Sequence, residues 1–302
     1  MRVNPICGFL GSGKTTLMRR IIDERGNREP MAVIVNEFGD VGIDGAILSG
    51  QSVDMVEITS GCLCCTLKGS LVSALEELRD KKGSRRVVIE ATGVAQPAEL
   101  LDVLADPALK GSIEVGPVVT VVDAAKFTGL RRVLGAFYTE QIRSADVLLV
   151  NKTDLARADQ LEAVRAEITA LNPQATVVAT ERCNVELNMI LDPARSIAGP
   201  SALEQGLASP APSASFVSFV VPTSFDADRA RVERFFAGLP AEMVRAKGFM
   251  SMDGRACTVQ FAAGQLEITP AASPRTLSLV FISSREPDRA GIQRGVEGTR
   301  RG

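Results

Sequence analysis

The chain of 302 residues is long enough for one large domain and a smaller one, and 45% hydrophobic with 23% charged residues is an ordinary globular composition. Its 34 basic and 36 acidic residues nearly cancel, so it lacks the positive field that binding to nucleic acids requires. The absence of histidine excludes Ser-His and Cys-His nucleophile pairs, and it leaves thiolates, carboxylates, backbone groups and water as metal ligands.

Short apolar runs alternate with amphipathic stretches over the first two thirds of the chain. The apolar runs, each expected to be a buried strand, are 3–7, 32–35, 53–58, 87–89, 118–122, 147–150 and 176–178. Helical spacing is found at 17–25, 71–81, 98–104, 126–142 and 158–171. This alternation predicts an α/β domain over residues 1–191, with a mostly parallel sheet covered by helices on both faces.

Prolines and glycines interrupt the periodicity between residues 192 and 215, which we interpret as a linker. Beyond it, a helix is expected at 229–237, and strands are expected at 216–221, 258–261, 266–268 and 277–282. These elements predict a small α+β domain over 216–284 without a chemical motif of its own. Residues 285–302 carry mixed charges and are expected to form a flexible tail.

The segment GFLGSGKTT at residues 8–16 fits the phosphate-loop pattern of Gly, four residues and Gly-Lys-Ser/Thr, and it lies between a predicted strand and a predicted helix. Glycines let backbone N–H groups surround phosphates, Lys14 reaches the β- and γ-phosphates, and the Thr15 hydroxyl binds magnesium. The residues expected to bind phosphate are Gly8, Gly11, Ser12, Gly13, Lys14, Thr15 and Thr16.

The base is expected to be read by Asn151-Lys152-Thr153-Asp154, directly after the strand 147–150. The Asp154 carboxylate can accept the N1–H and the exocyclic N–H of guanine, a pair of donors that adenine lacks. The motif therefore favours GTP over ATP. It also weakens the interpretation as a small-molecule kinase, for which the chain offers no second substrate motif.

Glu90 and Gly93 follow the strand 87–89, where a nucleotidase needs a carboxylate facing magnesium and a glycine amide facing the γ-phosphate. Direct and water-mediated binding of magnesium by Glu90 both remain open. Asp40 and Asp44 are equal candidates for positioning water or magnesium in a loop, 36–44, that we expect to close on the γ-phosphate. With Lys14 and Glu90 they form the predicted catalytic group. No arginine is obviously placed to assist, so slow intrinsic turnover is expected.

Three thiols lie within four residues, at Cys62, Cys64 and Cys65. Their redox state depends on the compartment. With the phosphate loop beginning at Gly8 there is no room for a signal peptide, and no apolar run reaches the length of a membrane span, so we expect a cytoplasmic protein with reduced thiols. Thiolates suit zinc, cobalt or copper(I), provided that the chain turns near Gly61. The dispersed Cys7, Cys183 and Cys257 are expected to be small buried residues.

The motifs GFLGSGKTT, VNEFGDVGID, ITSGCLCC, VIEATG and NKTD, in this order, resemble the CobW-type family of metal-chaperone GTPases over residues 3–179. From residue 216, the segments VRAKGFM and LVFISSR are similar to that family's C-terminal domain. The resemblance implies magnesium-dependent GTP hydrolysis coupled to delivery of zinc, cobalt or another metal to a client metalloprotein. It also implies that Glu37 joins Cys62, Cys64 and Cys65 as a metal ligand. Many relatives have histidine-rich segments that this chain lacks, which favours a single tight thiolate site.

An alternative function uses the same thiols differently. Adjacent thiols at Cys62–Cys65 could form a sulfenate or a disulfide, which would make the protein a redox-sensing GTP-binding regulator. For the leading hypothesis, the expected ligands are GTP, Mg²⁺ and a transition metal, Zn²⁺ or Co²⁺. The expected partner is a client metalloprotein that the sequence does not identify, with no nucleic acid and no membrane, and a homodimer is compatible with the sequence.

Overall fold

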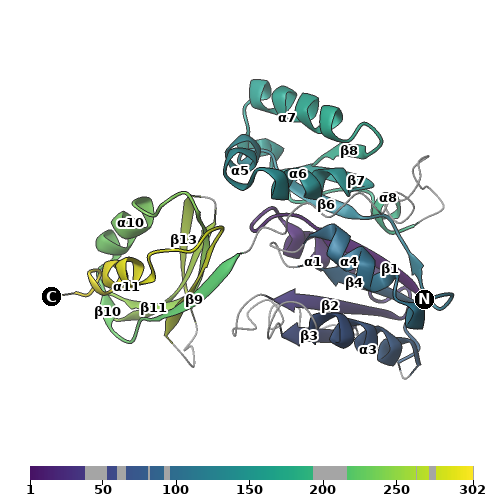
Figure 1. Ribbon diagram of the computed structural model, residues 1–302, viewed down its shortest axis with the longest axis horizontal. Coiled ribbons are helices and arrows are strands. Elements are labelled where there is room, and N and C mark those ends of the chain that lie inside the picture. Colours follow the sequence, from purple (N-terminus) through teal and green to yellow (C-terminus); the bar gives the residue numbers. More distant parts are fainter. Residues whose placement is uncertain are drawn as a thin grey trace. The chain divides into compact units, whose positions relative to one another are not determined.

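The computed structural model describes residues 1–37, 53–59, 66–80, 82–91, 96–192, 216–262, 264–271 and 277–301. Of the side chains, those of residues 36, 37, 55, 57–59 and 66–68 are outside this description. The chain divides into two compact units, one made of most of residues 1–192 and one of most of residues 216–301, each with its own sheet (Figure 1). In the described part, no helix has the length and apolar character needed to cross a membrane.

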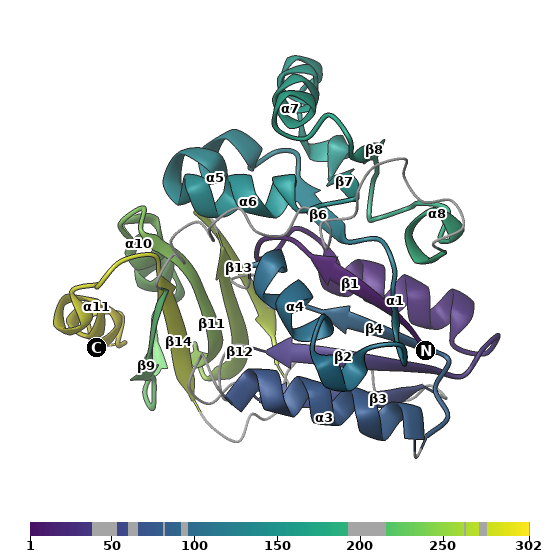
Figure 2. The ribbon, with the colours of Figure 1, turned by 45° about the vertical axis from the view of Figure 1, so that its right-hand side comes forward.

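The larger sheet consists of parallel strands in the order β3-β2-β4-β1-β6-β7-β8 (Figure 1 and Figure 2). A short strand, β5, pairs with the start of β1. Its strands are β1 (Arg2–Cys7), β2 (Met31–Glu37), β3 (Asp54–Thr59), β4 (Arg86–Glu90), β5 (Glu114–Val115), β6 (Val119–Asp123), β7 (Val147–Asn151) and β8 (Thr176–Ala179). Every apolar run expected to be a strand in this part is one. The central strands β4, β6 and β7 are buried at every position, which explains their continuous apolar sequences.

Helices cover both faces of this sheet. On one face α1 (Lys14–Arg25) and α8 (Asn188–Leu191) pack through residues such as Leu17, Ile21 and Ile190. On the opposite face α3 (Thr66–Asp80) and α4 (Pro97–Leu104) pack through residues such as Leu75 and Leu101. The predicted α/β fold with a doubly covered parallel sheet is therefore confirmed. Further elements are η1 (Pro107–Leu109), α5 (Phe127–Leu134), α6 (Ala136–Arg143), η2 (Thr153–Leu155) and α7 (Ala158–Leu171).

One predicted amphipathic stretch, 126–142, is two helices and not one. It breaks between α5 and α6 at Gly135, whose φ of 52° no right-handed helix contains. Glycine adopts this conformation without a Cβ penalty. The apolar spacing continued through the break, and the glycine was the only signal for it.

The second unit has a sheet whose strands β13-β12-β11-β14-β9 are antiparallel in this order, and the short strand β10 pairs in parallel with β11. Its elements are β9 (Val217–Pro222), β10 (Asp226–Ala227), α10 (Arg229–Ala237), β11 (Met243–Met252), β12 (Arg255–Ala262), β13 (Gln265–Pro270), β14 (Ser278–Ser283) and α11 (Arg289–Glu297). One core joins the sheet to both helices through side chains such as Phe236, Phe281 and Val296.

Two expectations for this unit need correction. The central strand β11 was not predicted, because charged residues and Gly248 interrupt its apolar pattern. A Cβ at Gly248 would lie 2.0 Å from the carbonyl oxygen of Ser278, so glycine is what lets β14 approach. The expected flexible tail contains α11, which buries Ile292 and Val296 in the core. The mixed charges of the tail had obscured this i, i+4 apolar pair.

Candidate nucleotide site

The phosphate loop connects β1 to α1 in a conformation that requires glycine at two of its positions. Gly8 and Gly13 have φ values of 130° and 121°. A Cβ atom would lie 2.3 Å from the Val121 carbonyl oxygen if placed on Gly8, and 2.4 Å from Asn151 Nδ2 if placed on Gly13. The backbone of the loop is thus pressed against β6 and against the end of β7, and its N–H groups lead into the N-terminus of α1, which has no acidic residue in its first turn.

Polar side chains line the start of α1. Lys14 is buried, and its Nζ lies 3.4 Å from the carbonyl oxygen of Phe9 in the loop. The hydroxyl of Thr15 donates to Glu90 Oε1 at 3.2 Å, and Glu90 is the buried last residue of β4. Ser12 Oγ is buried without a hydrogen-bond partner among the described residues. The carboxyl edge of the sheet, where β1 and β4 end, therefore combines a cation, a hydroxyl-carboxylate pair and an unsatisfied hydroxyl. These groups suit a phosphate with its metal ion.

The remaining loop residues differ in exposure. Gly11 and Thr16 are both exposed, and Gly11 has a φ of 73°. They flank the buried Ser12 and Lys14, so the predicted phosphate-binding residues form the loop and the first turn of α1.

The base-reading motif is joined to the phosphate loop by Asn151. Its Nδ2 donates to the Ser12 carbonyl oxygen at 2.9 Å, and Asn151 itself is buried at the end of β7. Lys152 follows with a left-handed φ of 62°, and its Nζ lies 2.8 Å from Asp123 Oδ2. Asp154 is exposed and makes no hydrogen bond or ion pair with any described residue. The amide of Asn151 is used to join two loops, while the carboxylate of Asp154 is available to a ligand.

Sequence reasoning missed the loop after β8. Asn151 Oδ1 accepts from Thr180 Oγ1 at 3.1 Å and from the backbone N–H of Cys183 at 2.8 Å. Arg182 and Cys183 both have positive φ, and Cys183 Sγ donates to the Gly13 carbonyl oxygen at 3.4 Å. The position of this loop after the next strand of the sheet was the one available signal, since its residue types are undistinguished.

Two of the dispersed cysteines are buried beside the phosphate loop, as expected. Burial raises the pKa of Cys7 to about 12, and it raises the pKa of Cys183 to about 11. Cys257 in β12 is half-buried and packs against the core of the second unit, so for this residue the expectation of burial is met only in part. A thiol with so high a pKa is a poor nucleophile and a poor metal ligand, which argues against redox chemistry at Cys7 and Cys183.

Several predicted site residues lie outside the described residues: Asp40, Asp44, Cys62, Cys64, Cys65 and Gly93. Glu37 is described through its backbone only, as the last residue of β2, where it pairs with Thr59 at the end of β3. The three cysteines fall in the connection from β3 to α3, so both strand ends that flank the predicted metal site leave the same edge of the sheet as β1 and β4. The described residues themselves contain no group of three side chains suited to hold a metal ion.

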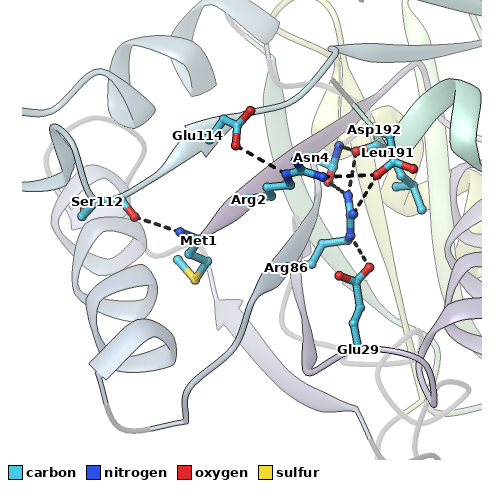
Figure 3. Close-up of polar contacts among 9 residues, drawn as sticks. All are labelled: Met1, Arg2, Asn4, Glu29, Arg86, Ser112, Glu114, Leu191 and Asp192. Carbon is cyan, nitrogen blue, oxygen red and sulfur yellow. Dashed lines mark hydrogen bonds and ion pairs between the residues drawn. The ribbon is translucent and has the colours of Figure 1, made fainter. Parts of the chain in front are cut away.

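The opposite edge of the same sheet holds a second buried polar cluster, centred on Arg86 (Figure 3). The Arg86 guanidinium donates to Glu29 Oε1 at 2.6 Å, to Asn4 Oδ1 at 2.8 Å, to the Leu191 carbonyl oxygen at 2.6 Å and to Asp192 Oδ1 at 3.1 Å. Asn4 Nδ2 donates to the same Leu191 oxygen at 3.0 Å. These contacts fasten the end of α8 and the residue after it to the starts of β1 and β4.

Comparison with known proteins agrees with this arrangement. The family model described as CobW/HypB/UreG, nucleotide-binding domain, matches residues 2–179, and the model described as Cobalamin synthesis protein cobW C-terminal domain matches residues 216–300. The zinc chaperone CobW of Sinorhizobium sp. is 28% identical over 336 residues, which cover 96% of this chain and 95% of that protein. The zinc chaperone YjiA of Escherichia coli is 29% identical over 275 residues, covering 83% of this chain and 84% of that protein.

A shorter match is found to the zinc-regulated GTPase metalloprotein activator 1 of Schizosaccharomyces pombe, at 36% identity over 186 residues, covering 59% of this chain and 45% of that protein. The family resemblance expected from the motifs is confirmed by the two family models, which together span both units. The chain belongs to the CobW/HypB/UreG family of nucleotide-binding proteins and carries a CobW C-terminal domain.

Proposed function

We propose that the protein is a GTP-hydrolysing metallochaperone, which binds zinc or cobalt at a thiolate site and delivers it to a client metalloprotein. The observation that carries this proposal is the 2.9 Å hydrogen bond from Asn151 Nδ2 to the Ser12 carbonyl oxygen. It joins the loop of Asp154 to the phosphate loop, so that one ligand with a base and a phosphate chain can contact both. The names of the relatives, zinc chaperones and a zinc-regulated GTPase, support zinc as the cargo.

The phosphate end of the site fits a nucleotide with magnesium. The glycine turn provides N–H groups, Lys14 provides a positive charge, and Thr15 with Glu90 provides two oxygen atoms 3.2 Å apart. Magnesium, when bound, would neutralise charge on the phosphates, with Thr15 and Glu90 as the residues of this chain that would hold it. Glu90 is buried and Thr15 is half-buried, so the pair is only partly shielded from water.

The base end of the site favours guanine. The exposed carboxylate of Asp154 can accept two adjacent N–H groups, and no described residue occupies it. A carboxylate faced with adenine would remain unsatisfied at one or both oxygens, because adenine offers no such donor pair. We therefore expect GDP and GTP to bind more tightly than ADP and ATP.

Isothermal titration of GDP and ADP into the wild-type protein and the Asp154→Asn variant tests this assignment. The amide would turn a donor toward the donors of guanine, so GDP binding should weaken by about 2 to 4 kcal/mol while ADP binding is unchanged. Glu162→Gln, which neutralises an exposed carboxylate on α7, is the matched control and should bind GDP like the wild type. Equal loss for GDP and ADP, or no loss for either, would remove base recognition from Asp154.

The proposed metal site consists of Cys62, Cys64, Cys65 and Glu37. Glu37 is the last residue of β2, and the three cysteines come after β3 in the sequence. Cobalt added with magnesium and a non-hydrolysable GTP analogue should give a thiolate charge-transfer band in the near ultraviolet, which oxygen ligands alone do not produce. Cys64→Ser should abolish the band and Cys257→Ser, in the second unit, should preserve it. A band that persists in serine variants of all three clustered cysteines would place the metal elsewhere.

A further inference from the structure

A buried carboxylate supports the loop that carries Asp154. Asp123 is the last residue of β6, paired with Asn151 across the sheet, and its side chain is 2% exposed. Its Oδ2 atom lies 2.8 Å from Lys152 Nζ, and its Oδ1 atom accepts the backbone N–H of Lys126 at 3.2 Å. Both oxygens of the carboxylate have a partner, so Asp123 is fixed in position. Its burial keeps it from contacting a base directly.

Lys152 adopts a conformation that requires such support. Of the four described non-glycine residues with positive φ, three lie around the side chain of Asn151: Lys152, Arg182 and Cys183. The left-handed conformation is unfavourable for a residue with a Cβ, and it persists where surrounding contacts hold it. The turn at Lys152 lets Asn151 point to Ser12 and leaves Asp154, two residues later, exposed. A contact that holds Lys152 therefore influences both neighbours.

The charge of Lys152 gives a second reason for the pairing. An ammonium group two residues from Asp154 is attracted to that carboxylate, and it would compete with the N–H donors of a base. With its Nζ held by Asp123 at the end of β6, the ammonium is directed to a different carboxylate. The side chain of Lys152 is 26% exposed, so its apolar stem remains accessible beside the motif.

We propose that Asp123 is a positioning residue for base recognition: it holds the Lys152 ammonium at the end of β6, and so keeps Asp154 oriented and unoccupied for a purine that offers two adjacent N–H donors. This inference rests on the proposed function, specifically on guanine recognition by Asp154. It assigns to Asp123 a role that acts through Lys152 and involves no contact with the nucleotide.

The test measures GDP and ADP affinities for the wild type, Asp123→Asn, Lys152→Met and the double variant, together with their thermal stabilities. Asparagine retains the size of Asp123 and an acceptor for the Lys126 N–H, but it removes the charge that holds Lys152. GDP affinity should fall about tenfold or more, which is the effect of losing one charge-assisted hydrogen bond between Asp154 and the base. ADP affinity should change by less than about twofold, because adenine lacks the donor pair that Asp154 recognises. A variant that is merely less stable would lose affinity for both ligands.

The double variant separates positioning through Lys152 from a general structural role. Because methionine keeps the apolar stem without the charge, adding Asp123→Asn to Lys152→Met should change GDP affinity by less than about twofold. Asp146→Asn is the matched control, because Asp146 is a half-buried carboxylate that accepts the Val118 N–H at the other end of β7. It should leave the ratio of GDP to ADP affinity unchanged.

The outcomes distinguish the role of Asp123 from guanine recognition by Asp154, on which that role rests. A wild type without preference for GDP would overturn guanine recognition, and the role of Asp123 with it. A wild type that prefers GDP, combined with an unchanged ratio in Asp123→Asn or with additive losses in the double variant, would overturn the role of Asp123 and leave the function standing. If Asp123→Asn does not fold, Lys152→Met tests the orientation of Asp154, because it removes the ion pair with Asp123 without freeing an ammonium to compete for Asp154. A reduced ratio of GDP to ADP affinity then supports the positioning role, and an unchanged ratio overturns it.

Discussion

The two edges of the larger sheet both bury polar groups, but among the described residues it is the carboxyl edge that holds a buried hydroxyl without a partner. At the amino edge, the Arg86 guanidinium, Asn4 and the Leu191 carbonyl oxygen satisfy one another within the protein (Figure 3). At the carboxyl edge, Ser12 Oγ is buried without a partner in the described part of the chain. Buried polarity is thus common to both edges, and it is the unsatisfied part of it that marks the ligand site.

The largest expected effect is on stability and comes from the Arg86 cluster at the amino edge. Replacing Arg86 with Met should lower the free energy of unfolding by about 3 to 5 kcal/mol, because Glu29, Asp192 and the buried Asn4 would lose a shared charged donor. Urea unfolding measures this loss, and GDP affinity of the folded protein should not change. The control is Arg2→Ala, a partly exposed member of the same cluster, for which we expect a loss of about 0 to 1 kcal/mol. Similar losses in both variants would show that burial does not distinguish these two arginines.

A substitution in the phosphate loop, at the carboxyl edge, should affect nucleotide binding as well as stability. Gly13→Ala would strain a backbone with φ of 121° and would push Asn151 Nδ2 away from a Cβ placed 2.4 Å from it. We expect nucleotide affinity to fall about tenfold or more, since strain of about 1 to 3 kcal/mol opposes the bound conformation. Gly129→Ala on α5 is the control, because its Cβ would meet no atom within 4 Å. That variant should be more stable by about 0.5 to 1 kcal/mol and should bind normally.

Over the range from pH 8 to pH 10, the smallest effect comes from the titration of Cys7. Folding raises the pKa of Cys7 from 9.0 to about 12, so above pH 9 the folded state binds more protons than the unfolded state. Stability due to this thiol is present below pH 9 and is lost as pH rises toward 12, by about 1.4 kcal/mol per pH unit. Urea unfolding at pH 8, 9 and 10 should show this decline, and the Cys7→Ala variant should show a shallower one. Parallel profiles for the two proteins would contradict the assignment to Cys7.

Local patterns in the sequence predicted the larger sheet and the motifs at its carboxyl edge. The residues 8–16 and the tetrad ending at Asp154 are contiguous, so their chemistry can be read without knowledge of the fold. Contacts between distant segments could not be predicted in this way. The bonds that join Asn151 to Cys183, and Lys152 to Asp123, depend on the pairing of β6, β7 and β8.

Arg86 shows the same limitation at the other edge, since an arginine at the start of an apolar run gives no sign that it will be buried. In the second unit, charge patterning outweighed a weak apolar signal, so that α11 was interpreted as a tail and β11 was overlooked. In both cases long-range packing decided the structure, against the local character of the sequence.

The coupling of nucleotide and metal is the central claim of the proposed function, and one titration tests it most directly. Zinc affinity should be measured with magnesium and either a non-hydrolysable GTP analogue or GDP, in the wild type and in Cys64→Ser. If the γ-phosphate helps to complete the thiolate site, zinc should bind about 5- to 150-fold more tightly with the analogue, and zinc should raise analogue affinity by the same factor. Cys64→Ser should weaken zinc binding and remove the difference. Equal zinc affinity in the two nucleotide states of the wild type would contradict a nucleotide-controlled metallochaperone.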